Sequence, residues 1–258
     1  MKRIFITLSL LLSLVGFSNI VKAQEPTLEP LTDVRVVTID LQNKAAFEKA
    51  LKAHMQYRVN KGDPYTWNVY SQVVGSQMES YVLRACCTNW DKIADYVEWS
   101  KGARTSAHWG QNVTKYVVSV DRYLTRFDDK NSVWDTEKNF KYFGVNTMTP
   151  APGEAFSIQS SIKAISDAAK EMKWPESWSW HTRIGGSPQI QLVVGYESYA
   201  DMMPQDKSFY QQLSEQMNSK EDAQELLEEY GESFSASDYS IYVFRKSLSS
   251  PEKATTAK

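Results

Sequence analysis

Two stretches decide the expected fold: Trp67-Asn-Val-Tyr-Ser-Gln-Val-Val-Gly75-Ser76 and Trp178-Ser-Trp-His-Thr-Arg-Ile-Gly-Gly186-Ser187. Tryptophan, glycine and serine recur in them at one constant offset. At the same offset and without a gap, Tyr81-Val82-Leu83 aligns with Leu192-Val193-Val194. Each stretch has the composition of a strand and ends in a glycine turn. The spacing therefore indicates an internal repeat.

The first copy of the repeat follows the order β-α-β-β-α-β. Its strands are rich in β-branched residues, and its first helix has apolar residues at helical spacing. We expect Thr88 to cap the second helix, with Trp90, Ile93, Ala94 and Val97 on its inner side. The expected elements are a strand at 34–41, a helix at 44–60, strands at 65–74 and 79–87, a helix after 88 and a strand at 113–127.

The second copy repeats this order. A polar segment at 128–139 separates the copies and is expected to be a linker. The expected elements are a strand at 140–148, a helix after Gly153, strands at 178–184 and 189–196, a helical region at 205–230 and a strand at 240–246.

This order is that of the ferredoxin-like split unit, whose sheet carries helices on one face only. The other face must also be covered, because the strand that holds Trp67 carries bulky side chains on both of its sides. A second copy in the same chain can cover it. We therefore expect an α+β protein of two tandem ferredoxin-like units, 34–127 and 140–247, with sheet facing sheet.

The tandem resembles the dimeric α/β-barrel superfamily through Trp67…Gly75, Trp178…Gly186 and Tyr199-Ala200-Asp201. Within it, the chain is most similar to NIPSNAP-like and antibiotic-biosynthesis-monooxygenase-like proteins, over residues 34–247. The resemblance implies an intramolecular dimeric α/β-barrel. That superfamily includes cofactor-free oxygenases, haem enzymes, isomerases and proteins without known activity, so it leaves open whether this chain is an enzyme. No motif with assigned chemistry matches, and the catalytic residues are unknown.

The first residues have the pattern of a cleavable secretory signal, 1–23. Lys2 and Arg3 precede an apolar run that is shorter than the roughly 20 residues of a membrane span. Gln24 begins the mature chain, which contains no second long apolar run. We expect a periplasmic or secreted protein without a membrane span, with a flexible lead-in at 24–33 and a disordered tail at 248–258.

Charge and cysteine usage exclude several kinds of partner. The chain has 29 Lys and Arg against 31 Asp and Glu, without the basic cluster that nucleic-acid binding requires. Cys86 and Cys87 are adjacent, and we expect both to be reduced rather than joined in a vicinal disulfide. No other Cys or His lies at ligand spacing, so no metal site is expected.

Two of the three histidines are candidate pocket residues in the first copy. His54 lies on the apolar side of the first helix, one turn before Arg58, and could serve as a base or a haem ligand. His108 follows the second helix beside Trp109. The alternatives are a satisfied boundary histidine at 54 and a solvated loop histidine at 108.

The third histidine lies in the second tryptophan stretch. Ser179, His181 and Arg183 share one face of the strand, opposite Trp178 and Trp180. If the tryptophans pack against helices, this polar trio faces the interior, where Arg183 needs an anionic ligand or an acidic partner. The alternative is an edge strand open to water.

Three hypotheses for the function follow. The first is an exported binding or accessory protein that holds an anionic or aromatic small molecule, because aromatic residues are abundant and no catalytic set is present. The second is a cofactor-independent monooxygenase or isomerase. The third is a structural or interaction protein without a pocket. No cofactor is expected, with haem left open, and the chain is either a monomeric pseudo-dimer or a homodimer.

The cleavage site gives a first testable prediction. Protein purified from the culture medium or periplasm should begin at Gln24, because Val21-Lys22-Ala23 has the small-residue pattern that precedes cleavage. N-terminal sequencing measures this. Recovery of chains that still begin with Met1 in a membrane fraction would contradict it.

Overall fold

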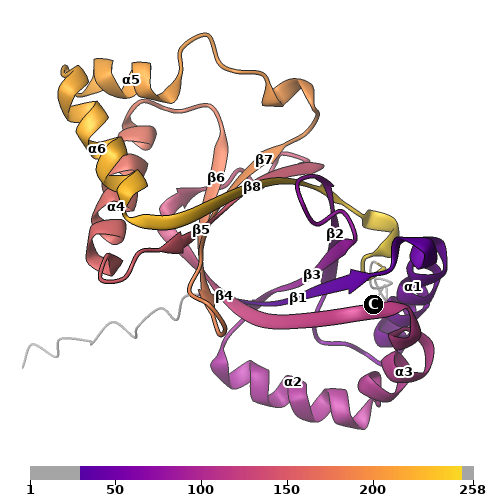
Figure 1. Cartoon of the computed structure of the whole chain (residues 1–258). Coiled ribbons are helices and arrows are strands. Elements are labelled where there is room, and N and C mark those ends of the chain that lie inside the picture. Colours follow the sequence, from indigo (N-terminus) through magenta and orange to yellow (C-terminus); the bar gives the residue numbers. More distant parts are fainter. Residues whose placement is uncertain (1–29, 252–258) are drawn as a thin grey trace, which may run out of the picture.

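The structure is a computed structural model that describes residues 30–251. The predicted signal segment, residues 24–29 of the predicted lead-in and residues 252–258 of the predicted tail lie outside the described residues. All eight strands form one closed barrel in the order β1-β3-β2-β8-β5-β7-β6-β4, and helices lie on its outer side (Figure 1). Within residues 30–251, no helix is both long and apolar enough to cross a bilayer.

The elements occur in the repeated order that the sequence predicts. The first half contains β1 (Leu31–Ile39), α1 (Lys44–Asn60), β2 (Trp67–Val74), β3 (Ser80–Thr88), α2 (Trp90–Gly102), α3 (Thr105–Asn112) and β4 (Val117–Val133). The second half contains β5 (Tyr142–Pro150), α4 (Ala155–Glu171), β6 (Ser177–Ile184), β7 (Ile190–Tyr196), α5 (Phe209–Gln216), α6 (Lys220–Glu232) and β8 (Phe234–Phe244). Short 3-10 turns lie at Leu41–Asn43, Thr114–Tyr116, Ala200–Met202 and Lys246–Leu248.

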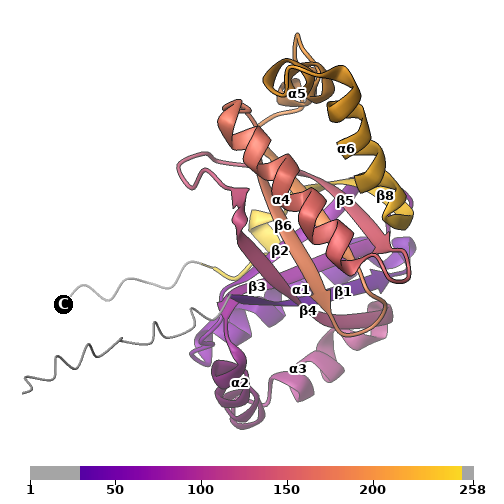
Figure 2. The same cartoon turned by 90° about the vertical axis from the view of Figure 1, so that its left-hand side faces the viewer.

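The strands of each half are adjacent in the same order, β4-β1-β3-β2 in the first and β8-β5-β7-β6 in the second. Every neighbouring pair is antiparallel. The halves join where β2 pairs with β8 and β4 pairs with β6. The sheets therefore close into a barrel through hydrogen bonds along their edges. Helices α1–α3 lie on one side of this barrel and α4–α6 on the opposite side (Figure 2).

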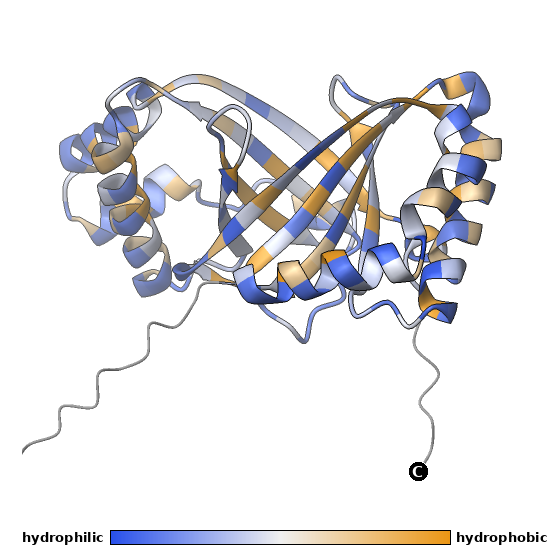
Figure 3. Cartoon of the chain, turned by 90° about the horizontal axis from the view of Figure 1, so that it is seen from below, coloured by the Kyte–Doolittle hydropathy of each residue, from blue (hydrophilic) through white to orange (hydrophobic). Residues whose placement is uncertain are grey.

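Each half has its own apolar core between its helices and the outer barrel face. In the first half, Phe47 and Leu51 of α1 pack with Val37 and Trp67 of the barrel. In the second half, Ile158 of α4 packs with Trp178 and Trp180. Polar and apolar bands follow one another along the strands (Figure 3), as period-two alternation requires when one side faces helices and the other faces the interior.

Several predicted boundaries differ from the structure. Strand β1 begins at Leu31, so residues 31–33 are strand rather than lead-in, and β4 includes residues 128–133 of the predicted linker. Strand β8 begins at Phe234, and the helical region before it is two helices. These strands are longer because each pairs on both of its sides around the closed barrel.

The start of the predicted disordered tail is ordered. Leu248 is buried. The Ser249 hydroxyl accepts a hydrogen bond from the backbone N–H of Val69 at 2.9 Å, and the Ser250 hydroxyl accepts one from the N–H of Trp67 at 3.0 Å. The residues after β8 thus cover the outer edge of β2.

The predicted inner side of the second helix is wrong. Trp90 and Val97 are exposed, and the buried residue of α2 is Tyr96. Tyr96 stacks on Tyr65 with ring centroids 4.0 Å apart, which turns the polar-tipped face of the helix inward instead of its aliphatic face.

The predicted redox state of the cysteines is also wrong. Cys86 and Cys87 form a disulfide across a cis peptide bond at the end of β3. Both side chains are exposed, so the bond ties no distant segments together.

Ending the chain after Ser247 should lower its stability, whereas ending it after Pro251 should not. The shorter chain loses the burial of Leu248, worth about 2 kcal/mol, which corresponds to a melting temperature lower by about 4–8 °C. Thermal unfolding followed by circular dichroism measures both chains. Equal melting temperatures would show that this segment does not stabilise β2.

Candidate functional site

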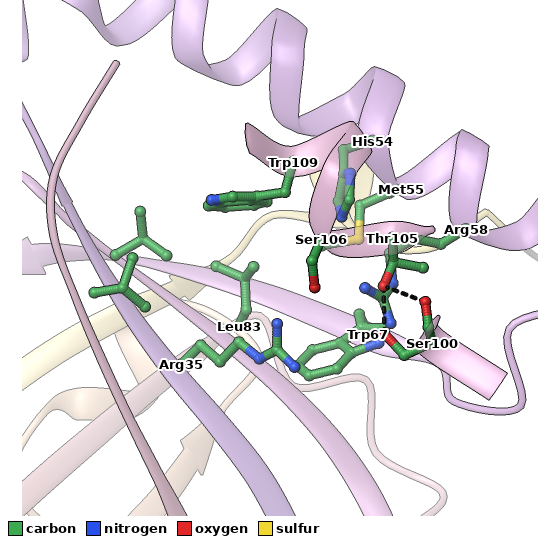
Figure 4. A pocket seen from close by; sticks show the side chains of 12 residues that line it. Arg35, His54, Met55, Arg58, Trp67, Leu83, Ser100, Thr105, Ser106 and Trp109 are labelled. Carbon is green, nitrogen blue, oxygen red and sulfur yellow. Dashed lines mark hydrogen bonds between the residues drawn. The ribbon is translucent and has the colours of Figure 1, made fainter. Parts of the chain in front are cut away.

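A pocket of about 160 Å³ lies between α1, α3 and the outer face of the first-half strands (Figure 4). Helices supply its roof and the strands supply its floor. Its wall is chemically mixed, with two arginines, one histidine, two tryptophans and three hydroxyl groups. The lining residues are Arg35, Val37, His54, Met55, Arg58, Trp67, Leu83, Ser100, Thr105, Ser106, Trp109 and Val120.

The structure brings His54 and His108 into direct contact. Their Nδ1 atoms are 3.0 Å apart, and the His54 ring meets the ring of Trp109 edge-on at 5.2 Å. Arg104, with φ of 54°, precedes α3 in a left-handed conformation, and α3 packs against α1. His108 is half-buried and stacks on Tyr57 at 4.0 Å, so it lies between the pocket and the surface.

Both imidazoles are held in the neutral form. Burial, with the nearby charge of Arg58, lowers the pKa of His54 to about 3, and burial also lowers the pKa of His108. In a hydrogen bond between two neutral imidazoles, one Nδ1 carries the proton and the other accepts it. His54 makes no second hydrogen bond to residues 30–251, so its Nε2 is free for a ligand.

Arg58, in the pocket wall, connects α1 to the loop that follows it and to α2 through its hydrogen bonds. Its guanidinium donates to Asp63 at 2.6 Å and to the hydroxyl of Tyr96, and both charged groups of the ion pair are buried. Since the charge of Arg58 is already balanced, it positions the wall of the pocket instead of offering a free cation. The predicted site residues His54 and Arg58 thus both line the pocket, but the guanidinium of Arg58 is already engaged by Asp63.

Two buried donors of the pocket have no hydrogen-bond partner. They are Nε of Arg35 and Nε1 of Trp67. The Arg35 guanidinium lies over the Trp67 ring at 4.8 Å, and that of Arg58 lies 5.1 Å from the same ring. An unpaired buried donor costs about 1–3 kcal/mol, so two in one pocket are the signature of a missing acceptor, either ligand or water.

The pocket continues into an outer cleft of about 490 Å³. The two spaces share Arg35, Ser100 and Ser106. Basic side chains dominate this cleft, and Arg122 also donates twice to the buried carboxylate of Asp33. The cations that line the outer cleft are Arg35, Lys101, Arg104 and Arg122. Arg35 and Arg122 both pair with Asp33, and Lys101 pairs with Glu98, so only two carboxylates of the described part of the chain pair with these four cations.

The other three candidate residues lie elsewhere, on β6. Trp178 and Trp180 pack outward against α4, and the opposite face of the strand turns toward the barrel interior. His181 is buried and its Nε2 lies 3.0 Å from the Ser179 hydroxyl. Arg183 lines the barrel cavity and is paired with Asp121 at 2.7 Å. The six candidates thus form two separate groups.

Sequence reasoning missed the residues that give the first pocket its chemistry. Arg35 is a charged residue in the middle of a β-branched strand, which was a readable signal for a special environment. Trp67 was recognised for the repeat but not as a pocket wall. The contact between His54 and His108 joins residues 54 positions apart, and no local pattern predicts it.

The second half has a helix–sheet pocket of a different kind, of about 250 Å³. It is almost wholly apolar. Its lining residues are Ile165, Ser166, Ala169, Trp174, Glu176, Trp178, Trp180, Leu192, Val194, Phe209, Leu227 and Tyr230. The two halves therefore share a fold but not a site chemistry.

Neither the pocket that contains His54 nor the barrel cavity is suited to haem. Its iron takes an axial histidine, cysteine, methionine or tyrosine. The pocket that contains His54 is smaller than the roughly 300 Å³ of ordinary small-molecule sites. The barrel cavity is larger but is lined by no histidine, cysteine or methionine, and burial raises the pKa of its tyrosines, in Tyr242 to about 12. Residues 30–251 hold no metal-ligating cluster of three or more side chains.

Comparisons with known proteins define the fold. No family model matches the chain, and no curated protein matches it. Solved structures are similar over most of its length. A Lactobacillus acidophilus protein provisionally assigned as a monooxygenase is 9% identical with a TM-score of 0.53, covering 84% of this chain and 94% of its own. An anthrone oxidase-like protein is 12% identical with a TM-score of 0.52, covering 89% and 97%.

A chlorite dismutase variant from Candidatus Nitrospira defluvii is 6% identical, with a TM-score of 0.54, and covers 86% of this chain and 94% of its own. These neighbours belong to the dimeric α/β-barrel superfamily, and the present chain has that fold in a single polypeptide. At such low identity the likeness establishes the fold and assigns no activity.

The neutral histidines predict a dependence of stability on pH. The pKa of His54 and of His181 is about 3 in the folded protein and about 6.5 when unfolded. Between these values the unfolded chain binds protons that the folded chain does not, so stability should fall as pH falls from 6.5 toward 3. Each histidine contributes up to about 1.4 kcal/mol per pH unit. His54→Gln should make the dependence shallower, as measured by urea unfolding at several pH values. A His54 imidazole that titrates near 6 by NMR would contradict the assignment.

Proposed function

We propose that the helix–sheet pocket of the first half binds a small organic oxyanion and transfers a proton from it. This is the chemistry of a cofactor-independent oxygenase or isomerase. The observation that carries the proposal is the convergence of two unpartnered donors, Arg35 Nε and Trp67 Nε1, on a pocket that also contains the His54–His108 pair.

The donors define what the ligand must offer. A carboxylate, enolate or phenolate oxygen at the pocket floor would accept from Arg35 and Trp67 and remove the cost of leaving them unpaired. Charge-assisted bonds of this kind strengthen as negative charge develops on the ligand oxygen. The floor therefore favours a substrate whose oxygen becomes more negative when a neighbouring C–H or O–H loses its proton.

The histidine pair provides the path for that proton. Nε2 of His54 accepts it while Nδ1 of His54 passes its own proton to Nδ1 of His108, which is closer to solvent. Because burial lowers the pKa of His54, the ring does not retain the charge. Proton and charge leave the pocket together, and the substrate anion remains bound to the floor.

Two outcomes can follow the same deprotonation. The anion can be reprotonated at another carbon, which is isomerisation. Alternatively it can reduce dioxygen, so that a methylene group and dioxygen become a carbonyl group and one molecule of water. The anthrone oxidase-like neighbour supports testing this second outcome first.

We also propose that the two halves are tandem ferredoxin-like copies and that the chain is exported. The identical strand order in each half supports the first proposal. The charged start, apolar run and cleavage pattern at 1–23 support the second.

Oxygen uptake with anthrone tests the proposed chemistry, because anthrone has an acidic methylene group and an oxyanion as its enolate. His54→Gln should lower the turnover rate by about 100-fold or more. Arg35→Gln should instead weaken anthrone binding, measured by quenching of the pocket tryptophans. Lys163→Gln, on the exposed face of α4, is the matched control and should leave both unchanged. The rate without protein is subtracted, since anthrone oxidises slowly in air.

The outcomes separate the proposed catalysis by His54 from the proposed oxyanion binding by Arg35. Equal turnover by His54→Gln and the unaltered protein would remove the catalytic assignment. Quenching that depends on Arg35, without any oxygen uptake or isomerised product, would leave a binding protein. Quenching that is unchanged in Arg35→Gln would remove the oxyanion site.

A further inference from the structure

We propose that the interior of the barrel is a second, independent binding site, for an aromatic small molecule that carries one carboxylate. The cavity has a volume of about 590 Å³, which is the size of ordinary small-molecule sites. Residues from all eight strands line it. The interior is therefore not a filled core.

The cavity is lined by two arginines, Arg84 and Arg183, and by two aspartates, Asp121 and Asp238, and within residues 30–251 only Arg183 and Asp121 pair with each other. Arg183 pairs with Asp121 at 2.7 Å and stacks on Tyr123 at 3.9 Å. The carboxylate of Asp238 accepts from the Ser240 hydroxyl at 3.0 Å. Arg84, on the same inner surface, has no carboxylate within ion-pair distance in the described part of the chain.

This distribution corrects the site predicted from sequence. The sequence placed the anion at Arg183, with an acidic partner as the other possibility. Since Asp121 is that partner, Arg183 is already satisfied. Arg84 is the group that a ligand carboxylate would balance.

A second observation points to the same place. Nδ1 of His181 and the hydroxyl of Thr125 are buried without a hydrogen-bond partner. They belong to the paired strands β4 and β6, where Thr125 lies opposite Arg183 and Phe127 lies opposite His181. Burial, and after it the charge of Arg84, lowers the pKa of His181 to about 3. By period-two alternation Thr125 and His181 share the inward face of their strands with Tyr123 and Arg183, which line the cavity, so these unpaired polar groups lie just beyond its wall.

The remaining wall suits an aromatic ring. Tyr70 and Phe143 meet edge-to-face at 5.2 Å, and valines surround them. The apolar lining residues are Val34, Val36, Val82, Phe143, Val145 and Val193. An aromatic ligand would pack its flat apolar ring against this wall and direct its carboxylate toward Arg84, so it would contact both the apolar and the charged parts of the lining.

Two hairpins supply the rim. Ser76 and Gln77 follow β2, Gln189 precedes β7, and all three line the cavity. Arg183 reaches toward this rim by donating to the Gly185 carbonyl and to Gln189. A ligand can therefore enter between the hairpins without opening the strand pairing of the barrel.

Calorimetric titration with naphthoate, a two-ring monocarboxylate, tests the inference on the full mature chain. The unaltered protein should bind one naphthoate per chain, and Arg84→Gln should weaken binding by about tenfold to hundredfold. Arg84→Lys keeps the charge and should retain part of the affinity. Lys163→Gln, on the exposed face of α4, is the matched control and should bind naphthoate normally. Thermal unfolding of each variant confirms that it is folded.

A second variant, which fills the cavity without removing a charge, tests the site independently in case Arg84→Gln does not fold. Val145→Phe adds bulk to the cavity wall and should reduce naphthoate binding without removing a charge. Neutral methylnaphthalene should bind more weakly than naphthoate, and equal binding of the two would remove Arg84 from the site. No heat from either compound would mean that water alone fills the cavity, which overturns the proposal.

The proposals for the two sites can fail separately. Loss of naphthoate binding in Arg35→Gln but not in Arg84→Gln would overturn the barrel site and leave the helix–sheet pocket intact. Loss in Arg84→Gln but not in Arg35→Gln would establish the barrel site, whether or not the protein turns over anthrone.

Discussion

The pairing of β2 with β8 and of β4 with β6 is the constraint on which the rest of the molecule depends. These two contacts close the barrel, so every strand has a neighbour on both sides. In a closed barrel each strand must send alternate side chains inward and outward. The outer set forms the two helix-covered cores, and the inner set forms the barrel cavity. The positions of both proposed sites follow from this single alternation.

The fold could largely be predicted from sequence because its signals are periodic and local. The tryptophan-to-glycine spacing predicted two halves with the same order of elements, and β-branched runs located the strands. Predictions failed where a distant partner decides the outcome. Strand β4 continues to Val133 because β6 pairs with it, and Leu248 is ordered because it packs in the first-half core. The inner face of α2 was missed because Tyr96 stacks on Tyr65, far away in the sequence.

The candidate residues were found more readily than their grouping. The spacing of residues in the sequence is enough to place a histidine on an apolar helix face and three polar residues on one face of a strand. It is not enough to place their partners, since Asp121 reaches Arg183 across β4 and β6, and His108 reaches His54 only when α3 folds over α1. Arg35 and Arg84 were missed for the same reason. A charged residue within a strand is informative only once its neighbours are known: Arg35 lies 3.6 Å from Asp33 but keeps a buried Nε without a partner, whereas Arg84 has no carboxylate within ion-pair distance in residues 30–251.

The two halves have the same strand order, but their helix–sheet pockets differ in chemistry. Trp67 and Trp178 occupy equivalent places in the repeat. Nε1 of Trp178 donates to the carbonyl of Asn131 at 2.9 Å, whereas Nε1 of Trp67 is buried without an acceptor. Two arginines lie against the ring of Trp67, whereas the pocket lined by Trp178 contains no arginine. Burial and shape are similar in the two copies, so they do not distinguish a binding site from packing. The unpaired donors of the first-half pocket are the difference that supports the proposed site, because an unpaired donor costs stability that a bound ligand or water restores.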